Sequence, residues 1–294
     1  MTTSTLANSL SELPEYRQVL ANLIARDLKV KYQSKSLGFA WSLLAPAIMI
    51  GILYAVFSRG LRVQMPDYWA FLLAGILPFQ FFSESIVAGA AAIRGSAGII
   101  RKIYVPMEIP VIAAVTVRAI EFVLQMVLAV VMLVVLHRGT SHLEHPDGMV
   151  HPPPVAALGA LHIDVAKTAI VLPAAIALTY IFVLGVSMPL AAWSVIYRDI
   201  DHIITIVMRV LFYATPIFWP AWGFPFPHVL QLNPASALIA LFRGPMFFGT
   251  WPFVEATGQG PFVAWGIAVI FAFGALVGGY VMFGRTKHIL AEVV

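Results

Sequence analysis

Four ionisable side chains fall inside long apolar stretches of this sequence, where they must either carry out chemistry or be neutralised by packing. They are Glu84, Arg118, Glu121 and Arg209. A charge at the centre of a membrane-spanning helix costs about 2.5–3.5 kcal/mol on insertion scales, and such residues usually face a bundle interior or a wet cavity. We expect these four either to line a polar path or to exchange ion pairs between helices. The alternative is a fixed Arg118–Glu121 pair at i, i+3 and an Arg209 that reaches toward the membrane surface.

The residue patterns of an enzyme are missing. The sequence has no G-x-x-x-x-G-K-[ST] phosphate loop, so we expect no ATP hydrolysis by this chain; any ATP and magnesium would bind a separate partner ATPase. It has no cysteine, and no Ser/His/Asp order or paired carboxylates argue for catalysis. Five histidines in the loop 137–167 lie among prolines without HxxxH spacing, so we predict no metal site there: His137, His142, His145, His151 and His162.

The elements that would position these residues are membrane helices. The chain has 294 residues, of which 60% are hydrophobic and 11% charged, whereas a soluble domain has about 25% charged residues. Residues 1–14 lack the basic and apolar regions of a cleaved signal peptide. Apolar runs long enough to span predict an all-α membrane protein with six spans, at about 37–57, 68–92, 109–136, 169–196, 203–219 and 262–283. We expect prolines to interrupt the second and fourth spans.

Residues 15–36 predict an amphipathic helix lying on the membrane. Its apolar positions recur at helical spacing, and its basic residues suit anionic lipid. Asp27 and Lys31, four residues apart near the apolar stripe, could pair and suggest contact with protein as well as lipid. The polar residues that we assign to this interfacial helix are Arg26, Asp27, Lys29, Lys31 and Tyr32.

Residues 93–110 form a basic segment between the second and third spans, with too many charges to span and more apolar residues than a plain loop needs. Ile93, Ala97, Ile100 and Tyr104 recur at helical spacing. We interpret the segment as a cytosolic helix that docks on another protein; the alternative is a membrane-surface turn with ordinary positive-inside charges.

Charge placement orients the chain. With the N-terminus inside, 11 of the 18 Lys and Arg residues fall on the inner side and five on the outer side; the other two are Arg118 and Arg209. This bias predicts cytosolic termini and a cytosolic segment 93–110. After Pro216, prolines come too densely for a continuous helix, which predicts a re-entrant or interfacial hairpin in which Asn233 and Pro234 begin a short helix. No internal repeat is evident.

Four stretches in register resemble one family, over nearly the whole chain. They are Arg26-Asp27-Leu28-Lys29-Val30-Lys31-Tyr32 with Leu37-Gly38-Phe39-Ala40-Trp41; the stretch 99–110; Tyr197-Arg198-Asp199-Ile200; and Thr215-Pro216-Ile217 with Leu232-Asn233-Pro234 and Leu241-Phe242-Arg243. The chain is similar to the permease subunit of bacterial ABC-2 exporters, which move O-antigen, teichoic acid and related lipid-linked polysaccharides. It departs from them at Met107, where the family usually has arginine, and in a longer loop 137–167.

The resemblance implies a homodimer in the cytoplasmic membrane, bound to two copies of an ABC ATPase and exporting a lipid-linked glycan. It divides the chain into a cytosolic N-terminus with the interfacial helix (1–36), an ABC-2 transmembrane domain (37–283) and a cytosolic tail (284–294). It makes 93–110 the coupling helix, with the ATPase contacts Arg94, Ile100, Arg101, Lys102, Tyr104 and Glu108. It also implies a path between two copies, lined by aromatics that suit sugar rings. The residues that we assign to this path are six aromatics and the four charges inside the apolar stretches: Tyr54, Phe57, Phe79, Phe82, Glu84, Arg118, Glu121, Arg209, Tyr213 and Trp219.

Two other functions remain open at the level of sequence. The same fold could export a drug or a lipid. A membrane-embedded glycosyl- or acyltransferase is a different class, and it would need a polar catalytic cluster at the bilayer surface, which the predicted spans do not offer.

Overall fold

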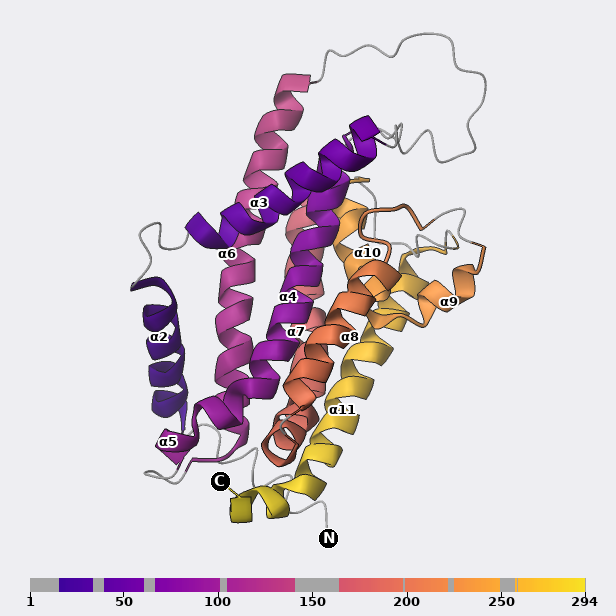
Figure 1. Ribbon diagram of the computed structural model, residues 1–294. Coiled ribbons are helices and arrows are strands. Elements are labelled where there is room, and N and C mark those ends of the chain that lie inside the picture. The colour runs from indigo at the N-terminus through magenta and orange to yellow at the C-terminus, as the bar shows by residue number, and fades with distance from the viewer. Residues whose placement is uncertain are drawn as a thin grey trace.

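The computed structural model describes residues 16–33, 40–60, 67–100, 105–140, 164–197, 199–221, 225–248, 257 and 259–293. These residues form a helical bundle, which confirms the predicted all-α class (Figure 1). In chain order the helices are α2 (Arg17–Gln33), α3 (Ala40–Tyr54) with a π-helical turn (Ala55–Gly60), α4 (Tyr68–Gly95), α5 (Ala97–Ile100), α6 (Glu108–Thr140), α7 (Val165–Ile196), α8 (Ile200–Ala214), α9 (Pro227–Gln231), α10 (Pro234–Met246) and α11 (Pro261–Val293).

Among the described residues, five helices are long and apolar enough to cross a membrane: α3 with its π-helical turn, α4, α6, α7 and α11. Helix α8, which covers the fifth predicted span, has 15 residues. At 1.5 Å per residue it is about 22 Å long, shorter than a hydrocarbon core of about 30 Å. The structure therefore supports a membrane bundle, and the count of six spans stays a prediction.

Helix α4 is the centre of the bundle. In its most apolar stretch 78% of the residues are buried, against 6% in α3, which crosses the outside of the bundle (Figure 1). α4 packs against α6, α7, α8 and α10, so most other helices are positioned through it. Helix α2 begins and α11 ends at the same end of the bundle as α5 (Figure 1), here called the α5 end.

Three prolines differ from the expectation that they interrupt spans. Pro78 lies inside a continuous α4, and both Pro173 and Pro189 lie inside a continuous α7. A proline removes one backbone hydrogen bond and disturbs the preceding turn, and a packed membrane helix tolerates this when neighbours satisfy the freed groups.

The close approach of α7 and α11 depends on two glycines. A Cβ built on Gly279 would lie 1.9 Å from the carbonyl oxygen of Gly185, and a Cβ on Gly185 would lie 2.4 Å from the backbone of Ala275. Small residues let membrane helices pack through direct backbone contact. The pair thus sets the separation of these two long helices.

The proline-rich region after α8 contains the predicted short helix that begins at Asn233 and Pro234, whereas its placement in a membrane stays a prediction. The helices α9 and α10 are too short to span and lie at the end of the bundle opposite α5 (Figure 1). Asn233 is the N-cap of α10, with Pro234 at its first position, and the Asn233 side chain accepts a hydrogen bond from the backbone N–H of Ala235 at 3.0 Å.

Candidate functional site

A continuous polar network joins α2, α6 and α4. Glu121 of α6 accepts hydrogen bonds from Lys31 Nζ at 2.7 Å, from the Tyr32 hydroxyl, and from Arg118 Nη1 at 3.1 Å. Arg118 Nη1 also contacts Glu84 of α4 at 3.0 Å, and Glu84 accepts a hydrogen bond from Gln80 at 2.8 Å. The network therefore attaches the N-terminal helix to two helices of the bundle.

Glu121 is the most enclosed member of this network. Its side chain is 6% exposed, whereas those of Lys31 and Arg118 are each 25% exposed and that of Glu84 is 41% exposed. Two carboxylates face two cations, so the group is neutral overall. A buried charge without its partner is costly, and the structure satisfies Glu121 with three donors. Burial, reinforced by the hydrogen bond to Glu121, raises the pKa of Tyr32, which keeps the hydroxyl protonated as a donor.

The network changes several sequence-based interpretations. Arg118 and Glu121 do pair, but they belong to a larger network of ion pairs and hydrogen bonds that the prediction of a single pair did not include. Asp27 does not pair with Lys31: it accepts from Arg26 at 2.7 Å, and Lys31 turns inward to Glu121. The i, i+4 spacing could not reveal Glu121 as partner, because 90 residues separate it from Lys31.

The apolar stripe of α2 packs on protein. Leu23 is buried against Val105, Ile109 and Ala113 at the beginning of α6, and Tyr16, Val19, Leu20 and Ile24 pack around it. In Figure 1, α2 runs alongside α6. The predicted helix and its stripe are present, and α6 supplies the contact with protein that we expected in addition to lipid. Lys29 is exposed, as predicted for the polar face.

Arg209 and Tyr213 lie on an exposed face of α8. They continue a stripe with His202 and Thr205, at positions i, i+3, i+7 and i+11 of one helix. Arg209 forms no ion pair with any residue in the described ranges. This short helix thus presents a polar stripe away from the bundle, in addition to its packed apolar side around Ile204.

The aromatic path residues divide into core and surface. Phe79 and Phe82 are 5% and 3% exposed: Phe79 meets the ring of Phe212 edge-on and Phe82 stacks on Phe182, so in a single copy both pack inside the bundle. Phe57 is partly buried and contacts Tyr68 and Phe218. The remaining three are reachable from outside: Tyr54 and Tyr213 are exposed and Trp219 is partly exposed.

The segment 93–110 is not one helix. α4 continues to Gly95, the four-residue α5 follows, and α6 begins at Glu108. Ile100 is the last residue of α5, whereas Arg101, Lys102 and Tyr104 lie outside the described residues. Glu108 is only 6% exposed, which argues against a direct contact with a partner. Arg94 forms an ion pair with Asp201 in the first turn of α8.

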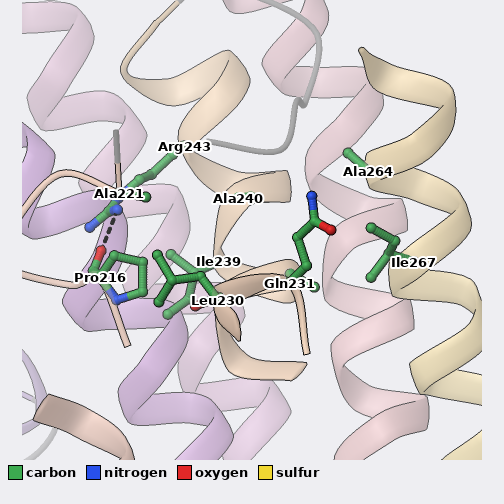
Figure 2. A pocket seen from close by; sticks show the side chains of 11 residues that line it. Pro216, Ala221, Leu230, Gln231, Ile239, Ala240, Arg243, Ala264 and Ile267 are labelled. Atoms are coloured by element: carbon green, nitrogen blue, oxygen red, sulfur yellow. Dashed lines mark hydrogen bonds between the residues drawn. The ribbon is translucent and has the colours of Figure 1, made fainter. Parts of the chain in front are cut away.

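Arg243, one of the five charges counted on the outer side, has a buried position that the sequence did not reveal. It is fully buried in α10, where its guanidinium donates to the carbonyl of Pro216 at 2.5 Å (Figure 2). The guanidinium also donates to the carbonyl of Ile217 at 2.6 Å and lies 3.7 Å from the ring centre of Phe71. Gly75 makes room for it, because a Cβ there would lie 2.5 Å from Nη2. A small cavity of about 30 Å³ adjoins Arg243, enough for a water molecule or two.

These contacts hold both ends of the short helix α8. Arg243 binds the backbone directly after α8, and the Tyr68 hydroxyl at the beginning of α4 donates to the carbonyl of Phe218 in the same stretch. At the other end of α8, Asp201 binds Arg94. The short helix α8 is therefore attached at both ends.

Comparison with known proteins assigns this chain to one family. The profile of the ABC-2 type transporter family matches residues 18–247. The chain belongs to the ABC-2 type transporter family. It is a transport component embedded in the membrane, and the matched range runs from α2 to the end of α10.

Two of the relatives cover most of the chain, and a third covers about a quarter of it. The O-antigen export system permease protein RfbA of Klebsiella pneumoniae is 26% identical over 280 residues, covering 94% of this chain and 95% of its own length. The protein of the same name from Myxococcus xanthus is 31% identical over 248 residues, covering 83% and 86%. The polysialic acid transport protein KpsM of Escherichia coli is 30% identical over 79 residues, covering 26% of this chain and 31% of its own.

Proposed function

We propose that this chain is the membrane-spanning subunit of an ATP-driven exporter that moves a lipid-linked polysaccharide out across the bacterial cytoplasmic membrane. The observation that carries the proposal is the match, over 83–94% of the chain, to permeases named for O-antigen export. The sequence contains no phosphate loop, so ATP and magnesium are assigned to a separate ABC ATPase.

Two copies of the chain would form the path between them. The support is the exposed stripe of α8, which places Arg209 and Tyr213 on the outside of a single copy. A charged side chain facing lipid is costly, whereas one that faces a water-filled path is not. Tyr54 of α3 is exposed as well and offers an aromatic surface for sugar rings.

ATP-driven motion would enter at the α5 end, which the charge bias places in the cytosol. The support is the ion pair between Arg94, directly before α5, and Asp201 of α8. A displacement of the segment 97–107 would pull on α8 through this pair. In this scheme Arg101 and Lys102 contact the ATPase and Arg94 passes the motion on.

The test is reconstitution with the cognate ATPase in lipid vesicles. Wild-type permease should stimulate ATP hydrolysis and move a lipid-linked polysaccharide, and the double variant R101E/K102E should lose most of the stimulation while still inserting. The double variant R17E/K29E reverses two exposed charges on α2 as a control. Normal stimulation by R101E/K102E would count against the coupling scheme.

Substrate choice separates the alternatives. Export of a drug or a plain lipid, with no movement of lipid-linked sugar, would replace the polysaccharide proposal within the same family. Transfer of sugar or acyl groups by the purified chain alone would show an embedded transferase.

A further inference from the structure

One face of the central helix α4 stays open although the rest of the helix is buried. Residues 70–79 are all buried, whereas from position 80 to the end of the helix the residues that are not buried recur at intervals of three and four and so share one side. They are Gln80, Ser83, Glu84, Val87, Ala88, Ala91, Arg94 and Gly95, here called the open face of α4. It begins inside the apolar part of the helix and reaches the α5 end.

Two ion pairs show which helices border the open face. Glu84 binds Arg118 of α6, and Arg94, nearer the α5 end, binds Asp201 of α8. Figure 1 accordingly shows α4 between α6 and α8. A groove of about 420 Å³ extends over the small residues of the open face near the α5 end, between α4, α6 and α2. The open face is therefore accessible along its length in a single copy of the chain.

The polar groups on the open face do not suit contact with lipid. The large exposed side chains of α6 and α11 are apolar, as expected for helices that face hydrocarbon; examples are Val127, Val131, Ile270, Phe273 and Val277. The open face of α4 instead carries an amide, a hydroxyl and a carboxylate at positions 80, 83 and 84. Ionisable side chains inside a membrane span usually face a bundle interior or a water-filled cavity. The open face thus calls for a polar occupant.

The free hydrogen-bonding groups of this face suit an uncharged occupant. Both charges of the face are already paired, so a phosphate or another anion gains little there. Within the described part of the chain the Ser83 hydroxyl has no hydrogen-bond partner, and Gln80 uses one N–H on Glu84, which leaves its carbonyl and its second N–H. Neutral donors and acceptors of this kind match sugar hydroxyls. They are also few, and a path needs contacts weak enough for the substrate to leave.

We propose that the open face of α4 contacts the sugar hydroxyls of the exported polysaccharide, with Gln80 and Ser83 as the hydrogen-bonding residues. The inference rests on the proposed function and deepens it, because it names the part of the substrate that meets this face: uncharged sugar and not its phosphate. Phe79 and Phe82, next to these residues in the sequence, are buried and point to other helices. The small residues between Ser83 and the α5 end leave width for a chain of sugars to approach.

The test places a photoreactive label on the open face in the complete exporter. The natural chain has no cysteine, so a maleimide-benzophenone reacts with S83C at one position only. The control V127C carries the same label on the apolar side of α6, where Val127 is 54% exposed. Each variant is reconstituted in vesicles with the cognate ATPase and a lipid-linked polysaccharide and is illuminated during ATP-driven transport. Mass spectrometry then identifies the molecule attached to the label.

We expect the label on S83C to attach to sugar and the label on V127C to attach to phospholipid. Attachment of S83C to a second copy of the chain or to phospholipid overturns the inference, because the face would then be an interface or a lipid-facing surface. A91C, on the same face, takes the place of S83C if that variant does not fold. Wild-type permease that moves no polysaccharide contradicts the proposed function itself, whereas transport without a sugar adduct on this face contradicts only the present inference.

A second measurement follows the rate of transport. S83L removes the hydroxyl and narrows the open face, so it should slow polysaccharide transport about 10-fold. V127L, the matched control, adds similar volume on the exposed side of α6 and should leave the rate unchanged. Gel filtration and thermal unfolding check that both variants are folded. A wild-type rate in S83L would overturn the inference.

Discussion

Replacing Glu121 with glutamine should loosen α2 from the bundle far more than the same change at Glu84. Glutamine at position 121 removes the negative charge that faces Lys31 and Arg118, and it cannot accept from all three present donors as well as a carboxylate does. Breaking a fully buried ion pair costs about 3–5 kcal/mol. Because Lys31 and Arg118 are each 25% exposed, part of their charge stays solvated, and we expect about 2–4 kcal/mol.

The control is E84Q. The Glu84 side chain is 41% exposed, so its pair with Arg118 resembles a surface ion pair, worth about 0–1 kcal/mol. At about 2 °C per kcal/mol for a chain of this size, E121Q should lower Tm in detergent by about 4–8 °C and E84Q by about 2 °C or less.

A second measurement follows α2 itself. The natural chain has no cysteine, so a spin label on A25C, at an exposed position of α2, reports only this helix. Its spectrum should become more mobile in E121Q and stay unchanged in E84Q. An equal or larger loss of stability in E84Q would refute the assignment of Glu121 as the centre of the network.

Three further substitutions test other contacts. R94D should greatly reduce the stimulation of the ATPase by the permease in vesicles, because it breaks the ion pair with Asp201. The charge swap R94D/D201R rebuilds the pair and should restore the stimulation. If the swap does not restore it, Arg94 does not act through its contact with α8. G279A should destabilise the bundle by about 1–3 kcal/mol in SDS unfolding, because the added methyl group overpacks the contact between α7 and α11. The control G278A should have no such effect, because a Cβ at Gly278 meets nothing within 4 Å. Equal effects of the two substitutions would contradict the tight backbone contact between these helices. R243K should cost about 2–4 kcal/mol in the same assay, since one ammonium cannot replace the bidentate contact with two carbonyls and the ring contact, and wild-type stability would contradict that role.

Features local in the sequence could be predicted. Apolar runs locate the helices, the spacing of Tyr16, Val19, Leu20 and Leu23 marks the buried side of α2, and Asn233 marks the beginning of α10, because each depends on residues within a few turns.

Features that depend on tertiary contacts could not be predicted from the sequence. The inward turn of Lys31 depends on Glu121, and the burial of Arg243 depends on Gly75 and two carbonyls from another part of the chain. An arginine between apolar residues near a helix end has the same local pattern whether it is external or buried. Aromatic residues such as Phe79 and Phe82 also occur on sugar-binding surfaces, and only their ring contacts in the folded chain show that these two lie in the core.

The attachment of α8 at both ends limits the movements that it can make. Helix α4 binds the beginning of α8 through Arg94. It also binds the backbone just after α8 through Tyr68, and α10 binds the same stretch of backbone through Arg243. A helix held in this way cannot slide along its neighbour without breaking one of these contacts. Rolling about its own axis would likewise move Asp201 away from Arg94 and lift Ile204 out of the core. As long as these contacts hold, α8 moves together with α4 and α10, so the short helix and its two neighbours form one mechanical unit.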